Sequence, residues 1–206
     1  VVNGVAQVGH NPTLLMANQL QPVSVTFPAA PSGTSAFALI GLEVTPREVM
    51  NLQGAVTPAS PMLKAPLLSV LPNSKYRLIA LLVDGLGGLS VVYRRALATA
   101  TLDVGTWFAP MPAATADHVG ASWTPPSDAT ISGAVIRDAG VDLVSITVFD
   151  GGVAATLPSR VALPVTGTFT VHSNAMRASF DVKSFSFETD YALVDAYSFG
   201  AGAPVN

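Results

Sequence analysis

The sequence predicts an all-β protein built as a β-sandwich. Three observations support this prediction. Apolar residues alternate with polar ones along many short segments, glycine and proline clusters separate those segments, and only 11% of the 206 residues are charged. Half of the residues are hydrophobic, which is too many for a disordered chain, and the charge is too sparse for a coiled coil. A chain of this length can form one sandwich or two smaller ones.

The first strands follow an N-terminal arm. Residues 1–20 are mixed in composition and show no clear period, so we interpret them as an arm. Beyond them, Val23, Val25 and Phe27 alternate with polar residues, which predicts a half-buried strand. After a turn cluster, residues 36–44 form a more continuous apolar run that is typical of a central strand.

A short helix is expected over residues 46–53. Thr45 stands at the N-cap, Pro46 at the first helical position and Glu48 at the third, which is the pattern of a capping box. Gly54 supplies a stop signal. We therefore predict one or two short helices beside the strands.

The remaining strands are separated by turns. Four prolines within residues 55–72 predict an irregular connection, and residues 75–83 read as a strand. The glycine-rich stretch 84–88 lacks the Lys-Ser/Thr that completes a phosphate loop, so we interpret it as a turn. Further strands are predicted at 97–108, 117–123, 141–149, 166–172, 178–187 and 191–199.

Cysteine and membrane signals are both missing from the sequence. Without cysteine, the chain has no disulfide, no thiolate nucleophile and no Cys-ligated metal. The longest aliphatic run, residues 78–83, is far shorter than the ~20 residues that cross a bilayer, so no membrane partner is expected. The first methionine is Met16, so we expect a processed or trimmed N-terminus, and no signal peptide is recognisable.

The charge distribution limits the class of partner. Residues 1–102 hold six basic and three acidic groups, a net charge of +3, and the rest of the chain holds four basic and ten acidic groups, a net charge of −6. Neither half has a basic arm that could neutralise many phosphates, so only weak contacts with nucleic acid are expected. Because so few charges cover the surface, we expect other copies of the chain to cover part of it.

No pattern for catalysis or for a cofactor is found. The histidines are His10, His118 and His172. None has a second ligand at helical spacing, so we interpret them as surface or interface residues. The acid pairs Asp138/Asp142 and Glu188/Asp190 lie around predicted turns, and no serine lies in a Gly-x-Ser-x-Gly elbow. We therefore expect a protein without enzymatic activity, cofactor or metal.

The middle of the chain resembles coat proteins of icosahedral plant viruses of the tymovirus type. The resemblance covers about 60 of the 206 residues. It consists of a Tyr-Arg-basic-Ala step, a proline-containing bend, a Val-Gly pair and a strand that ends in Trp-x-Pro. These features stand at Tyr93–Ala96, Pro110 and Pro112, Val119–Gly120 and Trp123–Pro125.

This resemblance implies an eight-stranded antiparallel jelly roll in a single domain, residues 21–206. It implies a capsid protein that self-assembles into an icosahedral virion around viral RNA, with weak direct RNA contacts. It also makes Arg94 and Arg95 candidates for an RNA-facing or subunit-contact role. A rim salt bridge to a neighbouring Asp or Glu is the alternative role for these arginines. The long proline-rich segment and the tail after Gly152 depart from the family pattern.

An alternative architecture is two tandem sandwiches, residues 21–108 and 112–206. Ser122–Pro126 resembles an early strand of an immunoglobulin- or fibronectin-III-like domain, and Asp181–Gly202 resembles its last strands. This alternative implies a secreted or cell-surface adhesion or filament protein. Strand pairing distinguishes the jelly roll from the tandem sandwiches. A jelly roll pairs residues 21–44 with strands of the C-terminal half, whereas tandem domains keep the strands of the two halves apart.

Overall fold

The computed structural model describes residues 17–45, 48–71, 73–149, 152–158, 160, 163, 168–178 and 194–205. In these residues the protein is almost entirely β-structure, and its antiparallel sheets form a sandwich-like arrangement, which confirms the all-β prediction. Two short 3₁₀ turns are also present, η1 at Ala17–Gln19 and η2 at Leu68–Val70. No helix in the described part of the chain is long and apolar enough to span a membrane.

The first half of the chain forms two sheets. The smaller one has the order β4-β1-β7, in which β7 runs parallel to β1. The four other strands of this half follow the order β3-β2-β5-β6. The strands are β1 Leu20–Thr26, β2 Thr34–Thr45, β3 Glu48–Val56, β4 Met62–Pro66, β5 Lys75–Asp84, β6 Leu89–Leu97 and β7 Thr101–Asp103.

The second half repeats this plan. A small sheet has the order β12-β9-β8, and the larger set of strands follows the order β11-β10-β13-β14, with β15 paired to one end of β13. The strands are β8 Thr115–Ala116, β9 Gly120–Ser122, β10 Ile131–Asp138, β11 Val141–Phe149, β12 Ala154–Thr156, β13 Phe169–Ala178, β14 Val194–Phe199 and β15 Ala203–Pro204.

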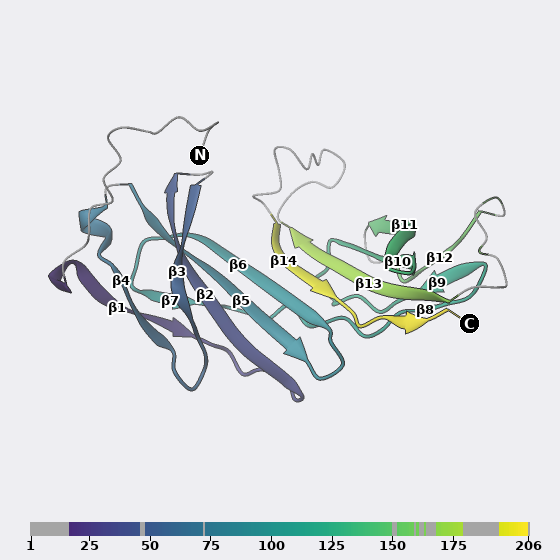
Figure 1. The fold of residues 1–206 in the computed structure, drawn as a ribbon, viewed down its shortest axis with the longest axis horizontal. Coiled ribbons are helices and arrows are strands. Elements are labelled where there is room, and N and C mark those ends of the chain that lie inside the picture. The colour runs from purple at the N-terminus through teal and green to yellow at the C-terminus, as the bar shows by residue number, and fades with distance from the viewer. Residues whose placement is uncertain are drawn as a thin grey trace.

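A single strand pair joins the halves among the described strands. β6 and β14 run antiparallel, with Val92 opposite Ala196 and Leu89 opposite Phe199. The larger sheets of both halves thereby form one continuous sheet with the order β11-β10-β13-β14-β6-β5-β2-β3. The halves lie one beside the other along the longest axis of the molecule, as Figure 1 shows.

The strand pairing expected of a jelly roll is wrong for the early strands. β1 pairs with β4 and β7, and β2 pairs with β3 and β5, so both find their partners before residue 104. This is the pairing expected of tandem sandwiches. The domain limits 21–108 and 112–206 stay a prediction, because pairing shows which strands share a sheet and not whether each half folds alone.

The predicted helix over residues 46–53 is also wrong. Residues 48–53 lie in β3, which forms a hairpin with β2, and Leu42 stands opposite Met50. The register between β2 and β3 shifts between Leu39 and Gly41, and Gly54 has a φ of +100°. This glycine therefore lies in an irregular stretch of strand and not at the end of a helix. The capping pattern is a local signal, and cross-strand pairing has overridden it.

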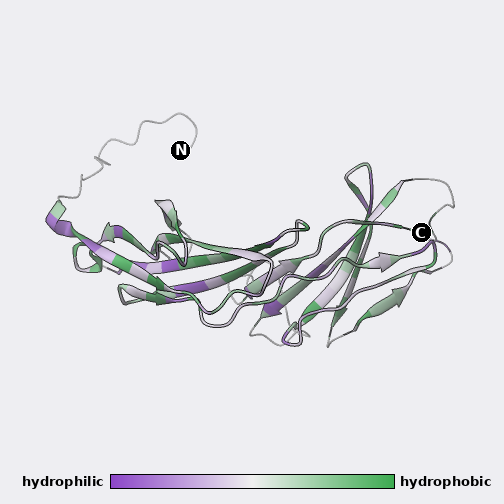
Figure 2. Ribbon diagram, turned by 90° about the horizontal axis from the view of Figure 1, so that it is seen from below, coloured by the Kyte–Doolittle hydropathy of each residue, from purple (hydrophilic) through white to green (hydrophobic). Residues whose placement is uncertain are grey.

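The core follows the alternation of the strands. In β5, Leu78, Ala80 and Leu82 have no exposed surface while the residues between them are half-buried. Burying each such leucine contributes about 1.5–3 kcal/mol. Figure 2 shows hydrophobic residues in the strands of both halves, interrupted by hydrophilic ones. Trp123 is 4% exposed, and its Nε1 donates a hydrogen bond to Ser132 Oγ at 2.9 Å.

The connection between the halves lies against the strand pair that joins them. Residues 104–114 carry several buried side chains, including Phe108 and Met111. The hydroxyl of Ser90 on β6 donates to the carbonyl of Phe108. The hydroxyl of Ser198 on β14 accepts a hydrogen bond from the Met111 N–H at 2.7 Å. The connection therefore crosses both strands of the pair and fixes one half against the other.

Candidate functional site

Arg94 and Arg95 lie on opposite faces of the continuous sheet, as neighbouring residues of a strand do. Arg94 shares the inner face with Val92 and Ser90. Its Nε donates to the Val104 carbonyl at 3.0 Å, and its NH1 lies 4.0 Å from Asp195 Oδ2. This geometry matches the rim salt bridge that the sequence allowed as the alternative role of Arg94.

Asp195 also belongs to a larger ion network. Arg177 on β13 donates from Nε to Asp195 at 3.0 Å and from NH1 to Asp128 at 2.6 Å. Its guanidinium lies 5.4 Å from the ring centre of Phe108. Burial lowers the pKa of Arg177, but hydrogen bonds to Asp128 and Asp195 outweigh this effect and raise the pKa above its usual value. Sequence reasoning missed this network, because its members are far apart along the chain.

Arg95 lies on the outer face, where it belongs to a second cluster. Tyr93 stands opposite Ile79 of β5, so its ring also projects from the outer face. The guanidinium carbons of Arg77 and Arg95 lie 5.5 and 5.6 Å from the centre of this ring. Buried residues alternate with Lys75 and Arg77 along β5, so these two side chains lie on the same face of the sheet. Lys75 is exposed there. We call Lys75, Arg77, Tyr93 and Arg95 the outer cationic patch.

The cations of the outer cationic patch form no ion pair within the part of the chain that the structure describes. Among the described residues, none of the four ion pairs involves one of its three cations, and no carboxylate lies within 4.0 Å of them. The acidic residue Glu43 stands opposite Lys75 in the sheet. Its Oε2 accepts a hydrogen bond from the Ala96 N–H at 3.0 Å, and it forms no ion pair with Lys75 within 4.0 Å.

Aromatic rings continue from the patch across the junction. The ring of Tyr197 on β14 meets that of Tyr93 edge to face, with 5.9 Å between the ring centres. Phe199, two residues further along β14, stacks on Tyr197 at 6.3 Å. The row of rings therefore crosses from one half of the molecule to the other on the outer face.

Beyond these rings lies an apolar cavity of about 230 Å³. It is lined by residues of four neighbouring strands, namely Ile131, Thr147, Phe149, Asn174, Ala175, Met176, Tyr197 and Phe199. Gly133 stands between Thr147 and Asn174 in the sheet, so the floor there carries no side chain. We call this cavity the outer groove.

A more polar cavity of about 310 Å³ adjoins the outer groove, since Asn174 and Phe199 line both. Its polar residues include His172 and Arg137. Burial, together with the positive charge of Arg137, lowers the pKa of His172, and Asp142 opposes this shift. Arg137 Nε donates to Asp142 at 2.6 Å, so this arginine is paired, unlike those of the outer cationic patch.

The other candidates from the sequence do not converge. His118 is half-buried in the second half, and its Nδ1 has no hydrogen-bond partner in the described part of the chain. His10, Glu188 and Asp190 lie outside the described residues. Within those residues, no group of three or more His, Cys, Asp or Glu could hold a metal ion.

The glycine-rich turn is confirmed as the hairpin between β5 and β6. Asp84 Oδ1 accepts hydrogen bonds from the N–H groups of Leu86 and Gly88 at 2.8 and 2.7 Å. Two of the amides that a phosphate loop would offer to a ligand are therefore already bound by this side chain.

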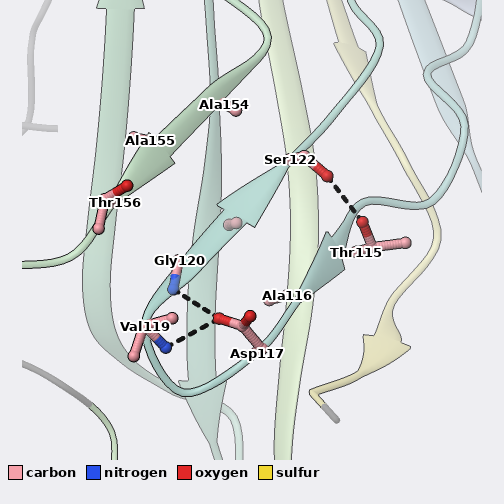
Figure 3. Close-up of a pocket in the computed structure, with 10 residues that line it drawn as sticks. Thr115, Ala116, Asp117, Val119, Gly120, Ser122, Ala154, Ala155 and Thr156 are labelled. Atoms are coloured by element: carbon pink, nitrogen blue, oxygen red, sulfur yellow. Dashed lines mark hydrogen bonds between the residues drawn. The ribbon is translucent and has the colours of Figure 1, made fainter.

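A shallow cavity of about 420 Å³ lies on the small sheet of the second half. Figure 3 shows that small side chains line it, with Asp117 as its charged residue. Asp117 Oδ1 accepts hydrogen bonds from the N–H groups of Val119 and Gly120, both at 2.8 Å. The hydroxyls of Thr115 and Ser122 bond to each other at 2.8 Å. The side chains of Asp117, Thr115 and Ser122 thus make their hydrogen bonds within the local turn and the strand pair.

A scan against protein-family models finds no match, and a search of curated proteins finds no significant relative.

Proposed function

We propose that the chain is a rigid tandem β-sandwich unit of an extracellular or cell-surface assembly. In this assembly it acts by binding other molecules and by holding them in position. This is the second of the two functions that the sequence allows. The observation that supports it best is the antiparallel pairing of β6 with β14, which joins two sets of strands edge to edge.

Three contacts give this junction its rigidity. Four consecutive residue pairs, from Leu89↔Phe199 to Val92↔Ala196, link the sheets. The connection is held by buried serine hydroxyls, and the Arg94–Asp195 pair lies at its rim. A flexible linker between two sandwiches would leave their orientation free, whereas these contacts fix it. A rigid, elongated body suits a protein that spans distance or presents a surface.

The coat-protein function loses one of its supports in this fold. The resemblance on which it rests implies a jelly roll, and the early strands do not pair as a jelly roll requires. The sparse charge still favours burial of some surface by other molecules.

The solution state of the purified chain tests the proposal. Size-exclusion chromatography with light scattering is expected to give a species near 21.1 kDa, or a small oligomer, and X-ray scattering to give an elongated particle. Antibody labelling of intact source cells is expected to stain their surface. Closed shells of tens of subunits in electron micrographs would contradict the proposal and favour the coat protein.

A further inference from the structure

From the outer cationic patch, we infer that the outer face of the continuous sheet binds a linear acidic polysaccharide through Lys75, Arg77 and Arg95. This inference rests on the proposed function, since it names the ligand that such a surface unit would hold. The chain as a whole carries a net charge of −3, so three cations on one face, none of them in an ion pair among the described residues, are a local feature.

The first argument is electrostatic. Arg77 and Arg95 both lie within 5.6 Å of the centre of the same tyrosine ring, and no described carboxylate neutralises either of them. Both positive charges therefore lie on the same part of the outer face, where a bound anion gains favourable electrostatic energy. Elsewhere in the described part of the chain, Arg94, Arg137 and Arg177 each have an acidic partner.

The second argument concerns the geometry of the cations. A guanidinium group presents a planar fork of donors that matches the two oxygens of a carboxylate. Tyr93 fixes the position of both guanidinium groups through its ring, which lowers the conformational entropy that they lose on binding. The patch is therefore prepared for carboxylate groups that repeat along a chain.

The third argument separates a polysaccharide from a single-stranded nucleic acid. Nucleic-acid sites of that kind stack bases on open aromatic faces. Here the guanidinium groups of Arg77 and Arg95 pack on the ring of Tyr93, and Tyr197 stacks on Phe199. Sugar rings need no insertion between aromatic side chains. Their C–H groups can contact the side chain of Phe199, which is 46% exposed.

Binding of polygalacturonate to the intact chain tests this inference, with neutral dextran and polyuridylate as comparison ligands. We expect polygalacturonate to bind, its affinity to fall with rising salt, and dextran not to bind. Each of the substitutions Arg77→Gln and Arg95→Gln is expected to weaken binding about tenfold, because each removes one charge-assisted contact. Lys64→Gln is the matched control, since this exposed lysine lies on β4 in the other sheet of the same half.

Three results would overturn the inference: equal binding of dextran, tighter binding of polyuridylate than of polygalacturonate, or a loss with Lys64→Gln as large as that with Arg95→Gln. Thermal unfolding of each variant shows whether its fold is intact. An elongated monomer that fails to bind polygalacturonate would contradict this inference alone, whereas a closed shell would contradict the proposed function.

Discussion

The backbone N–H of Met111 donates a hydrogen bond to the hydroxyl of Ser198 at 2.7 Å, although 87 positions separate the two residues. Both are buried, and the bond fastens the connection between the halves to β14. A second bond of the same kind joins Ser173 Oγ to the Pro112 carbonyl at 2.7 Å. The relative position of the halves is thus fixed by buried hydrogen bonds as well as by strand pairing.

Replacing Ser198 with alanine is expected to destabilise the chain by about 1–3 kcal/mol, because the Met111 N–H stays buried without an acceptor. Urea unfolding followed by circular dichroism measures this loss. Ser145→Ala is the control, since Ser145 is exposed on β11, and it is expected to change stability by no more than about 0.5 kcal/mol. Equal stability of the two variants would show that the bond to Ser198 contributes nothing.

The fold class could be predicted from the sequence, because alternation is a local property. The strands expected at 75–83 and 141–149 coincide with β5 and β11, and the turn at 84–88 is present. The choice of partner strands depends on contacts between distant residues, and this is where the prediction failed. The apolar stretch of β6 before Tyr93 was also missed, since it follows the glycine-rich turn without a break.

The candidate site could be predicted only in part. The sequence identified Arg94 and Arg95 together as candidates and allowed a rim salt bridge to a neighbouring Asp or Glu as an alternative role. Asp195, which lies near Arg94, and Arg77, which contacts the same Tyr93 ring as Arg95, lie on other strands, and no spacing along the chain identifies them. Asp128 and Arg177 come together for the same reason, through tertiary contacts alone.

Replacing Asp195 with asparagine is expected to cost about 1–2 kcal/mol. It removes an acidic partner from both Arg94 and Arg177, while Arg177 keeps Asp128. The side chain of Arg177 is only 15% exposed, so solvent compensates it poorly. Asp142→Asn breaks a more exposed ion pair with Arg137 and is expected to cost at most about 1 kcal/mol. Urea unfolding distinguishes the two variants, and the opposite order of their stabilities would contradict this account.

His172 predicts how stability depends on pH. Burial and Arg137 lower the pKa of His172 in the folded chain, so the unfolded chain binds a proton at this residue at higher pH than the folded chain does. The contribution of His172 to the unfolding free energy is therefore complete above the pKa of this residue in the unfolded chain, about 6.5. The contribution is lost as pH falls through the lower pKa that His172 has in the folded chain. Unfolding free energies between pH 5 and 7.5 are expected to fall less steeply for His172→Gln than for the wild type.

A titration by nuclear magnetic resonance checks the same point directly. The ring of His172 is expected to titrate below the usual histidine range, and Asp142→Asn is expected to lower its pKa further, because Asp142 opposes the shift. A pKa of His172 at or above its usual value would refute the prediction.

Gly133 on β10 is expected to tolerate no side chain. A Cβ at this position would lie 1.9 Å from the carbonyl oxygen of Ile146, so β10 and β11 would have to separate. We expect Gly133→Ala to cost about 2 kcal/mol or more in unfolding free energy. Gly85→Ala is the control, since a Cβ there meets no atom within 4 Å. Similar melting temperatures of the two variants would contradict the close approach of the strands.

An engineered disulfide tests the pairing of β6 with β14 most directly, because the chain has no cysteine of its own. Cross-strand partners lie about 4.5–5.5 Å apart at Cα, within the range that a disulfide spans. The double variant Leu89→Cys/Phe199→Cys is therefore expected to form an intramolecular disulfide on mild oxidation without losing its fold. In the control, Leu89→Cys/Phe149→Cys, four strand spacings separate β6 from β11, about 19 Å, so its thiols should stay free. If the first pair remains reduced or joins only separate chains, the continuous sheet is wrong.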